Sequence, residues 1–187
     1  MPVDADLPKW TVFELAGHFD ISIGLTRMLI AGQEQAQPAR DRTSFFINPR
    51  SETGPVVYGY AYTKVEGKTP ADMPGVLAET FTKTVAEARA VPPSLVGPGY
   101  FAPMRTDEFV ASRIVEAVVH GIDLAQALDV PYFASPDGLA VTAAILDDLL
   151  ARRTTGNRPA ELSGDLDWVL AASGRAPSDD NRLPLIG

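Results

Sequence analysis

The chain has 187 residues, of which 45% are hydrophobic and 21% charged, a balance typical of one soluble globular domain covering residues 1–187. Its formal net charge is −8 and its lysines and arginines are scattered, which argues against nucleic acid or an anionic membrane as the main partner. Cysteine is absent, so disulfide bonds and protein thiolate chemistry are excluded, and any sulfur nucleophile must come from a cosubstrate.

The sequence predicts neither a secretory signal at the N-terminus nor a membrane-spanning segment. The N-terminus is acidic and lacks the apolar core of a secretory signal. No apolar run approaches the roughly 20 residues that a membrane-spanning helix needs. We therefore expect a cytoplasmic protein.

The first predicted helix has a well-marked start. Thr11 and Glu14 are spaced as a capping box, in which each side chain bonds to the other residue's backbone N–H. The helix is expected to end near Ala31, before Gly32. Its inward-facing positions follow heptad-like spacing and are Leu15, His18, Ser22, Leu25 and Leu29. The first of the two histidines is therefore predicted to face the interior.

Residues 33–72 are the least regular part of the sequence. Residues 43–48 and 56–65 are rich in aromatic and β-branched residues, and tyrosines alternate in the second run. Residues 48–54, between the two runs, are typical of a turn. This pattern predicts a small β-hairpin or an irregular insertion at about residues 40–70.

The remaining sequence predicts further helices separated by proline- and glycine-rich loops. One should begin at a Thr106 cap, with Asp107 and Glu108 well placed for the helix dipole, and another at Ser135 followed by Pro136. The expected helices cover residues 75–90, 106–128, 135–153 and 165–173. Residues 174–187 are expected to form an extended tail. The predicted fold is mainly α, a helical bundle with one irregular insertion.

The helix predicted to start at the Thr106 cap carries a polar line among mostly apolar positions: Arg113, Glu116, His120 and Asp123. Glu116 and His120 are four residues apart, so they leave the same helix face one turn apart. Burying them is costly unless they are paired or bind a metal, and bundle cores often hold such sites. With His18 they form three ligands with the next position open, the pattern of a catalytic metal site.

Each of these residues also has an ordinary structural interpretation. His18 can be a core histidine, and His120 can bond to Glu116 or Asp123; a Glu-x-x-x-His pair is common by chance, so both interpretations stay open. Arg113 can anchor an anionic substrate through its planar guanidinium, or form a salt bridge to Glu116 or Asp123. Asp123 can accept the free N–H of a metal-bound imidazole, or lie in solvent near the helix end.

At these positions the sequence resembles the DinB-like metalloproteins, specifically the branch of mycothiol-dependent maleylpyruvate isomerase. The matching segments are residues 10–18, 113–127, 167–168 and 173–175. The resemblance implies a four-helix bundle that binds a divalent metal, usually zinc, through His18, Glu116 and His120. It also implies binding of a low-molecular-weight thiol such as mycothiol, which the metal holds as thiolate.

The sequence departs from the family pattern in three respects. Nine residues precede Trp10, where family members have a whole helix, so either the start is truncated or a later helix or partner chain fills that place. The insertion at 33–72 is longer and more strand-like than usual, and the isomerase's larger C-terminal domain has no counterpart. Maleylpyruvate is therefore not assumed as substrate. A homodimer would cover apolar surface left by a missing helix.

These features together predict a divalent-metal-dependent and thiol-dependent transferase or isomerase that acts on a small electrophile. Two nitrogens and one carboxylate suit zinc, and equally nickel, manganese, iron or cobalt. The expected partners are a mycothiol-like thiol and the electrophile, whose carboxylate Arg113 would steer. Two alternatives stay open, namely a metal-dependent hydrolase that activates water, and a non-catalytic metal-binding module that acts through a partner.

Overall fold

The structure is a computed structural model that describes residues 10–34, 36–47, 50–132, 134–154 and 156–186. Its α-helices within these residues are α1 (Val12–Ala31), α2 (Arg50–Val65), α3 (Met73–Arg89), α4 (Thr106–Ala127), α5 (Pro136–Arg153) and α6 (Asp165–Ala172). Short 3-10 turns are η1 (Ser44–Ile47), η2 (Pro70–Asp72) and η3 (Ala160–Leu162). Strands β1 (Val96–Gly97) and β2 (Met104–Arg105) pair in an antiparallel sheet. The prediction of a mainly α fold is confirmed.

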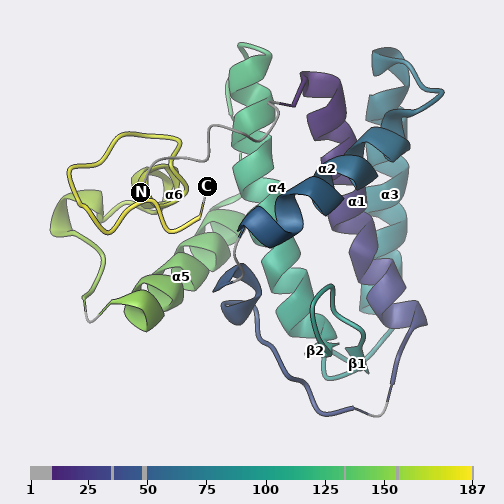
Figure 1. Ribbon diagram of the computed structural model, residues 1–187, viewed down its shortest axis with the longest axis horizontal. Helices are drawn as coiled ribbons and strands as arrows, with labels where there is room; N and C mark the ends of the chain where they lie inside the picture. Colours follow the sequence, from purple (N-terminus) through teal and green to yellow (C-terminus); the bar gives the residue numbers. More distant parts are fainter. Residues whose placement is uncertain (1–9, 35, 48–49, 133, 155, 187) are drawn as a thin grey trace.

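Helix α1 occupies the centre of the bundle and contacts α2, α3 and α4. In Figure 1, α1, α3 and α4 lie side by side, and α2 crosses them in front. Helix α5 packs on α4, and α6 packs on α5, which extends the bundle to one side. In the described part of the chain, none of the helices is long and apolar enough to cross a membrane.

The largest apolar core lies where α4, α5 and α6 meet. Its fully buried side chains include Val115, Ile122, Leu146, Leu149, Trp168 and Val169. Two smaller clusters flank α1, one beneath α2 and one at the sheet. Helix α4 therefore has one face in the large core, and the opposite face is left for α1.

Two of the three predicted N-terminal helix caps are confirmed. The capping box of α1 is confirmed, because Thr11 Oγ1 accepts from the Glu14 N–H at 3.2 Å and the Thr11 N–H donates to Glu14 Oε2 at 2.8 Å. Ser135 caps α5 through its hydroxyl alone, which accepts from the Gly138 N–H at 3.1 Å. The predicted Thr106 cap is wrong: α4 begins at Thr106 itself, whose hydroxyl donates to the Leu95 carbonyl.

The predicted β-hairpin is wrong in both of its runs, because residues 44–47 form the turn η1 and residues 50–65 form α2. Ala61 and Val65, four residues apart, are both buried, whereas Tyr60 and Tyr62 are exposed. Burial at helical spacing thus outweighs the β propensity of the tyrosines, which is a context-dependent preference. The irregular alternative holds for the segment before α2, apart from the turn η1. Asn48 and Pro49 of the predicted turn lie outside the described residues, as do the nine residues before Trp10.

Gly17 allows α2 to cross close to α1. A Cβ atom added at this position would lie 2.7 Å from the Ala61 carbonyl oxygen and 2.7 Å from Val65 Cγ1. Contacts this short do not occur between real side chains, so a larger residue would force α2 away from α1. The crossing lies one residue from His18 and therefore helps to set the position of this part of α1.

We predict that Gly17→Ala destabilises the protein by about 1–3 kcal/mol, because the strain of overpacking exceeds the gain in helix propensity. Gly24→Ala is the matched control in the same helix, since its Cβ would be 3.7 Å from Thr80 Cγ2, an ordinary contact. The control should be neutral or stabilise by up to about 1 kcal/mol. Urea denaturation of both variants tests this, and equal stability of the two would contradict the tight crossing.

Asp41 joins the segment before α2 to the end of α5. Its carboxylate accepts hydrogen bonds from Arg152 Nη1 at 3.0 Å and Nη2 at 2.8 Å, and from the Ser44 N–H at 2.7 Å. Burial alone would raise the pKa of Asp41, but the bonds from Arg152 and Ser44 outweigh it and lower the pKa from 3.8 to about 2. Ionised Asp41 is therefore favoured in the folded chain.

Because the pKa is lower in the folded state, this stabilisation is present above about pH 4 and is lost as the pH falls through about 2. Asp41→Asn should therefore lower the free energy of unfolding at pH 7 by up to about 1 kcal/mol, as expected for a solvent-exposed pair. The difference from the unaltered protein should shrink between pH 4 and pH 2. Denaturant titrations at a series of pH values measure it, and a difference independent of pH would rule out the assigned pairing.

Candidate metal centre

Three potential metal ligands converge between α1 and α4. His18 Nε2 lies 3.1 Å from His120 Nε2, and each of these nitrogens lies 3.4 Å from Glu116 Oε2. The two imidazole rings are nearly perpendicular, with centroids 4.7 Å apart. The structure thus brings together the three residues that the sequence pattern singled out, and each offers one ligand atom to a common point.

These separations match those required by a bound divalent ion. Ligands at about 2.05 Å from a tetrahedral zinc lie about 3.3 Å apart, and ligands at right angles on an octahedral ion lie about 3.0 Å apart. The observed separations of 3.1 to 3.4 Å lie close to these two values. Two imidazole nitrogens and one carboxylate oxygen are also a donor set that divalent transition metals accept. The residues therefore fit such an ion.

The local structure explains why the three side chains meet. His18 lies on the buried face of α1, and Glu116 and His120 lie one turn apart on the face of α4 that contacts α1. Trp10, just before α1, packs its ring against His18 with centroids 4.5 Å apart and lies 6.2 Å from the ring of His120. The side chains of the three ligand residues are mostly buried, with exposed fractions of 11% for His18, 17% for Glu116 and 16% for His120.

Glu116 is held as a carboxylate. Burial alone would raise its pKa, but hydrogen bonds with His120 and His18 and the positive charge of Arg113 outweigh burial and hold the pKa well below its ordinary value. Ser22 Oγ adds a donor at 3.4 Å from Glu116 Oε2. The site therefore presents a negative oxygen without requiring an added base.

The two imidazoles differ in their electrostatic environment. Burial lowers the pKa of His18 below 6.5. Burial also opposes protonation of His120, but its bonds to Asp123 and Glu116 outweigh this and raise its pKa. The two imidazoles therefore differ in proton affinity, and metal binding would require both ligand nitrogens to be free of a proton.

Arg113 does not reach outward as a substrate anchor would. Its guanidinium donates from Nη1 to Ser22 Oγ at 2.9 Å and from Nε and Nη2 to Ser112 Oγ at 3.2 Å. It also lies over the rings of Phe45 at 4.4 Å and Phe109 at 4.8 Å. With only 5% of its surface exposed, Arg113 makes internal contacts in place of the expected contact with a substrate carboxylate.

Asp123 lies on the side of the His120 ring opposite to His18 and Glu116. Its Oδ2 lies 3.0 Å from His120 Nδ1, which is the arrangement expected of a carboxylate that accepts the free N–H of a liganding imidazole. Arg175 binds both oxygens of the same carboxylate, from Nε at 2.8 Å and from Nη2 at 2.7 Å. Burial would raise the pKa of Asp123, but the bonds to His120 and Arg175 outweigh it and lower the pKa.

Sequence reasoning missed the roles of Ser22 and Arg175. Ser22 was placed on the inward face of α1, yet serine at such a position gives no signal of a bond to a distant carboxylate. Arg175 belongs to the Ser173-Gly174-Arg175 segment that resembles the family, and this resemblance was the available signal. The pairing of Arg175 with Asp123, 52 residues earlier, could not be read from spacing.

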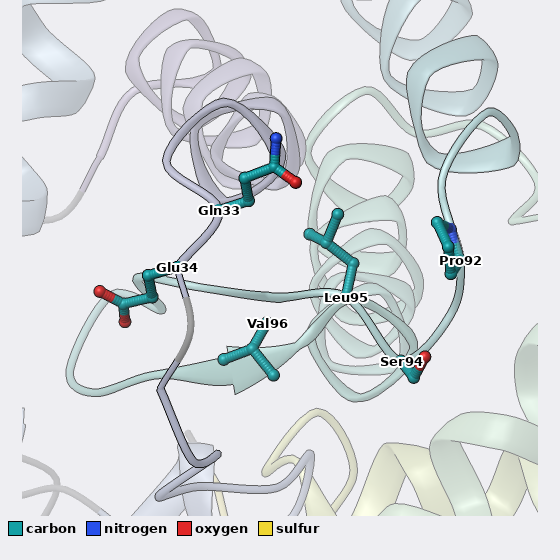
Figure 2. Close-up of a pocket in the computed structure, with 6 residues that line it drawn as sticks. All are labelled: Gln33, Glu34, Pro92, Ser94, Leu95 and Val96. Carbon is teal, nitrogen blue, oxygen red and sulfur yellow. The ribbon is translucent and has the colours of Figure 1, made fainter.

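Two cavities lie away from this centre. One, of about 440 Å³, lies between the segment after α1 and the segment from the end of α3 to β1. Figure 2 shows the six residues that line it: Gln33, Glu34, Pro92, Ser94, Leu95 and Val96. By the helical rise, Gln33 is roughly 20 Å along α1 from His18. The other, of about 500 Å³, lies between residues 38–44 and the start of α4. Neither is lined by the three ligand residues, so we place no chemistry in them.

The fold and the convergent side chains define a helical bundle with a candidate two-histidine, one-carboxylate metal centre. The chain belongs to the mycothiol maleylpyruvate isomerase N-terminal domain family, whose model matches residues 2–125. The resemblance noted in the sequence is thus confirmed. No curated protein and no solved structure matches the chain significantly. The family match ends inside α4, two residues after Asp123, so α5 and α6 lie beyond it.

We predict that the untagged protein binds one divalent ion per chain and that Glu116→Gln abolishes this stoichiometric binding. Asp20→Asn is the matched control, because Asp20 is a buried carboxylate on α1 that contacts Thr80 and Lys64 instead of the histidines. Elemental analysis after zinc loading and desalting measures both variants. Full zinc content in Glu116→Gln, or its equal loss in Asp20→Asn, would argue against the assigned ligands.

Proposed function

We propose that the chain is a divalent-metal-dependent and thiol-dependent transferase or isomerase that acts on a small electrophile. The observation that carries the proposal is the convergence of His18, Glu116 and His120 at the separations that a divalent ion requires. Membership in a family described by mycothiol-dependent isomerisation supports a thiol as cosubstrate. The lack of cysteine in the chain is consistent with sulfur supplied from outside.

The charges around the centre favour an anion as the additional ligand. Glu116 and Asp123 carry two negative charges, and Arg113 and Arg175 carry two positive charges close to them. These four charges cancel, and both imidazoles are neutral when they bind a metal. The full charge of the ion therefore remains to attract an anionic group such as a thiolate.

A divalent cation at this site supplies one kind of chemistry, namely a lowered pKa of a coordinating thiol. The chain's residues do the rest. His18, Glu116 and His120 would hold the cation, and Asp123 would accept a hydrogen bond from His120 Nδ1–H so that Nε2 faces the site. The ring of Trp10 shields one side of His18.

The thiol loses its proton to solvent, and its sulfur then forms a bond to the electrophilic carbon of the substrate. In conjugation, addition to a double bond ends when the displaced electron pair takes up a proton, and substitution at an aryl chloride ends when chloride leaves, so that one thiol is consumed for each product. In isomerisation, rotation about the former double bond is followed by cleavage of the carbon–sulfur bond, and the thiol is regenerated. The same first step serves both outcomes.

Arg113 has a positioning role in this proposal. Its bond to Ser22 and the bond from Ser22 to Glu116 form a chain that connects a buried guanidinium to the ligand carboxylate. The buried positive charge stabilises the ionised carboxylate. Recognition of the electrophile is therefore assigned to groups other than Arg113.

We predict that the zinc-loaded protein consumes an electrophile only when a thiol is present. The probes are an α,β-unsaturated dicarboxylate and an activated aryl chloride, each tested with mycothiol, glutathione and cysteine and followed by absorbance. Metal removal and Glu116→Gln should each lower the rate by about 100-fold or more, the scale of metal-assisted charge stabilisation. Asp20→Asn should retain the rate.

The possible outcomes separate the candidate functions. Turnover that persists after metal removal would sink the proposal. Metal-dependent turnover without any thiol would identify the hydrolase, in which the site activates water. If the metal is bound but no electrophile is consumed with any thiol, the non-catalytic module is favoured.

A further inference from the structure

The segment that follows α6 reaches back to the candidate metal centre through a single side chain. Arg175 forms a side-on, two-bond pair with Asp123, and its Nη1 donates to the Ser173 carbonyl at 2.5 Å. Asp123 in turn accepts from His120. Both charged side chains are mostly buried, with 15% exposure for Arg175 and 22% for Asp123.

We propose that Arg175 is a positioning residue for the metal centre: by clamping Asp123, it orients His120 and sets the affinity for the metal. The inference rests on the proposed metal site. It does not depend on which reaction the site performs.

The backbone around Arg175 is fixed by the way α6 ends. The Gly174 N–H bonds to the Ala171 carbonyl, and the Arg175 N–H bonds to the Leu170 carbonyl at 2.7 Å. Gly174 has φ of +75°, in the left-handed region that favours glycine. These are the two hydrogen bonds of a Schellman motif. The base of the Arg175 side chain is thus part of an ordered helix end.

Helix α6 is itself anchored in the largest core. Trp168 is completely buried, and its indole N–H donates to the Ala143 carbonyl of α5. The Leu185 N–H bonds back to the Ala172 carbonyl at 2.8 Å, so the last part of the chain covers the helix end. The position of Arg175 is therefore determined by helix-end bonds and by an apolar core that contains none of the three ligand side chains.

The clamp restricts Asp123 to one orientation. Asp123 Oδ1 accepts from Arg175 Nε, and Oδ2 accepts from both Arg175 Nη2 and His120 Nδ1. A carboxylate held on two atoms by a planar guanidinium cannot rotate without breaking both bonds. His120 consequently keeps its Nδ1 toward Asp123 and its Nε2 toward His18 and Glu116. Partners of this type commonly tune metal affinity by about 10–100-fold.

This role assigns a function to residues outside the family match. The match covers residues 2–125 and includes the three ligand residues and Asp123. Arg175 lies 50 residues past the end of that match, and nothing in the ligand motif requires it. The C-terminal part of the chain is thus coupled to the centre through one ion pair.

The test compares two arginines that pair with aspartates in similar ways. Arg158 binds Asp147 of α5 from Nε at 3.0 Å and from Nη2 at 2.7 Å, and lies over the Trp168 ring, away from the ligands. We expect Arg175→Gln to weaken Zn²⁺ binding by about 10–100-fold. Arg158→Gln should leave it unchanged. Competition for Zn²⁺ with a chromophoric chelator measures both affinities, and circular dichroism monitors the fold.

A coupling experiment distinguishes positioning through Asp123 from a general loss of structure. In an Asp123→Asn background, Arg175→Gln should cause little further loss of Zn²⁺ affinity, because the two residues act as one unit. The long-range ¹H–¹⁵N imidazole spectrum should show the Nδ1–H tautomer of His120 in the unaltered chain and in Arg158→Gln. That signal should be weakened in Arg175→Gln and partly recovered in Arg175→Lys.

Equal Zn²⁺ affinities of Arg175→Gln and Arg158→Gln would overturn the inference, as would additive losses in the Asp123→Asn background. If the unaltered chain binds no Zn²⁺, both the inference and the proposed function fail. If it binds Zn²⁺ but no thiol-dependent reaction occurs, the proposed function fails, and the affinity measurements still decide the role of Arg175.

Discussion

Two imidazole nitrogens and a carboxylate oxygen that face one another at 3.1 to 3.4 Å are the central constraint of this structure. Lone pairs on these atoms repel one another unless an N–H hydrogen or a cation lies between them, so the arrangement suits either hydrogen bonding or metal binding. The surrounding fold opposes the separation of these groups. Gly17 permits the close crossing of α2 over α1 beside His18, and α4 is held from behind by the largest core. The rigidity of the bundle thus holds three potential ligand atoms close together.

Two arginines compensate the two carboxylates of the centre by different routes. Arg113 is connected to Glu116 through the hydroxyl of Ser22, which accepts a hydrogen bond from the guanidinium and donates one to the carboxylate. Arg175 binds Asp123 directly. A buried guanidinium is costly on its own, and here the cost is offset by hydrogen bonds, by aromatic rings and by nearby negative charge. The protein contributes almost no net charge from these four groups, and the charge of a bound ion would not be diminished.

The parts of the molecule that could be predicted are those governed by local sequence. The capping box and heptad spacing of α1 gave its limits, and the two histidines were identified as partners because the chain contains no others. Helix α2 could not be predicted, because its alternating tyrosines resemble a strand and only burial of Ala61 and Val65 against α1 shows the helical face. Long-range packing decided this segment against its local propensity.

The orientation of long polar side chains was the other limit of prediction. Arg113 shares a helix line with Glu116 and His120, and spacing alone places all three at one site. Its guanidinium instead turns between two aromatic rings, one of them from Phe45 in η1, a segment whose position depends on the tertiary fold. Arg175 presents the opposite case, in which a residue far along the chain enters the centre because a helix-ending turn directs it there. Helix spacing therefore identifies which ligands can meet, whereas the turns and loops determine which charges surround them. If the site binds a metal as proposed, these surrounding charges would tune its affinity.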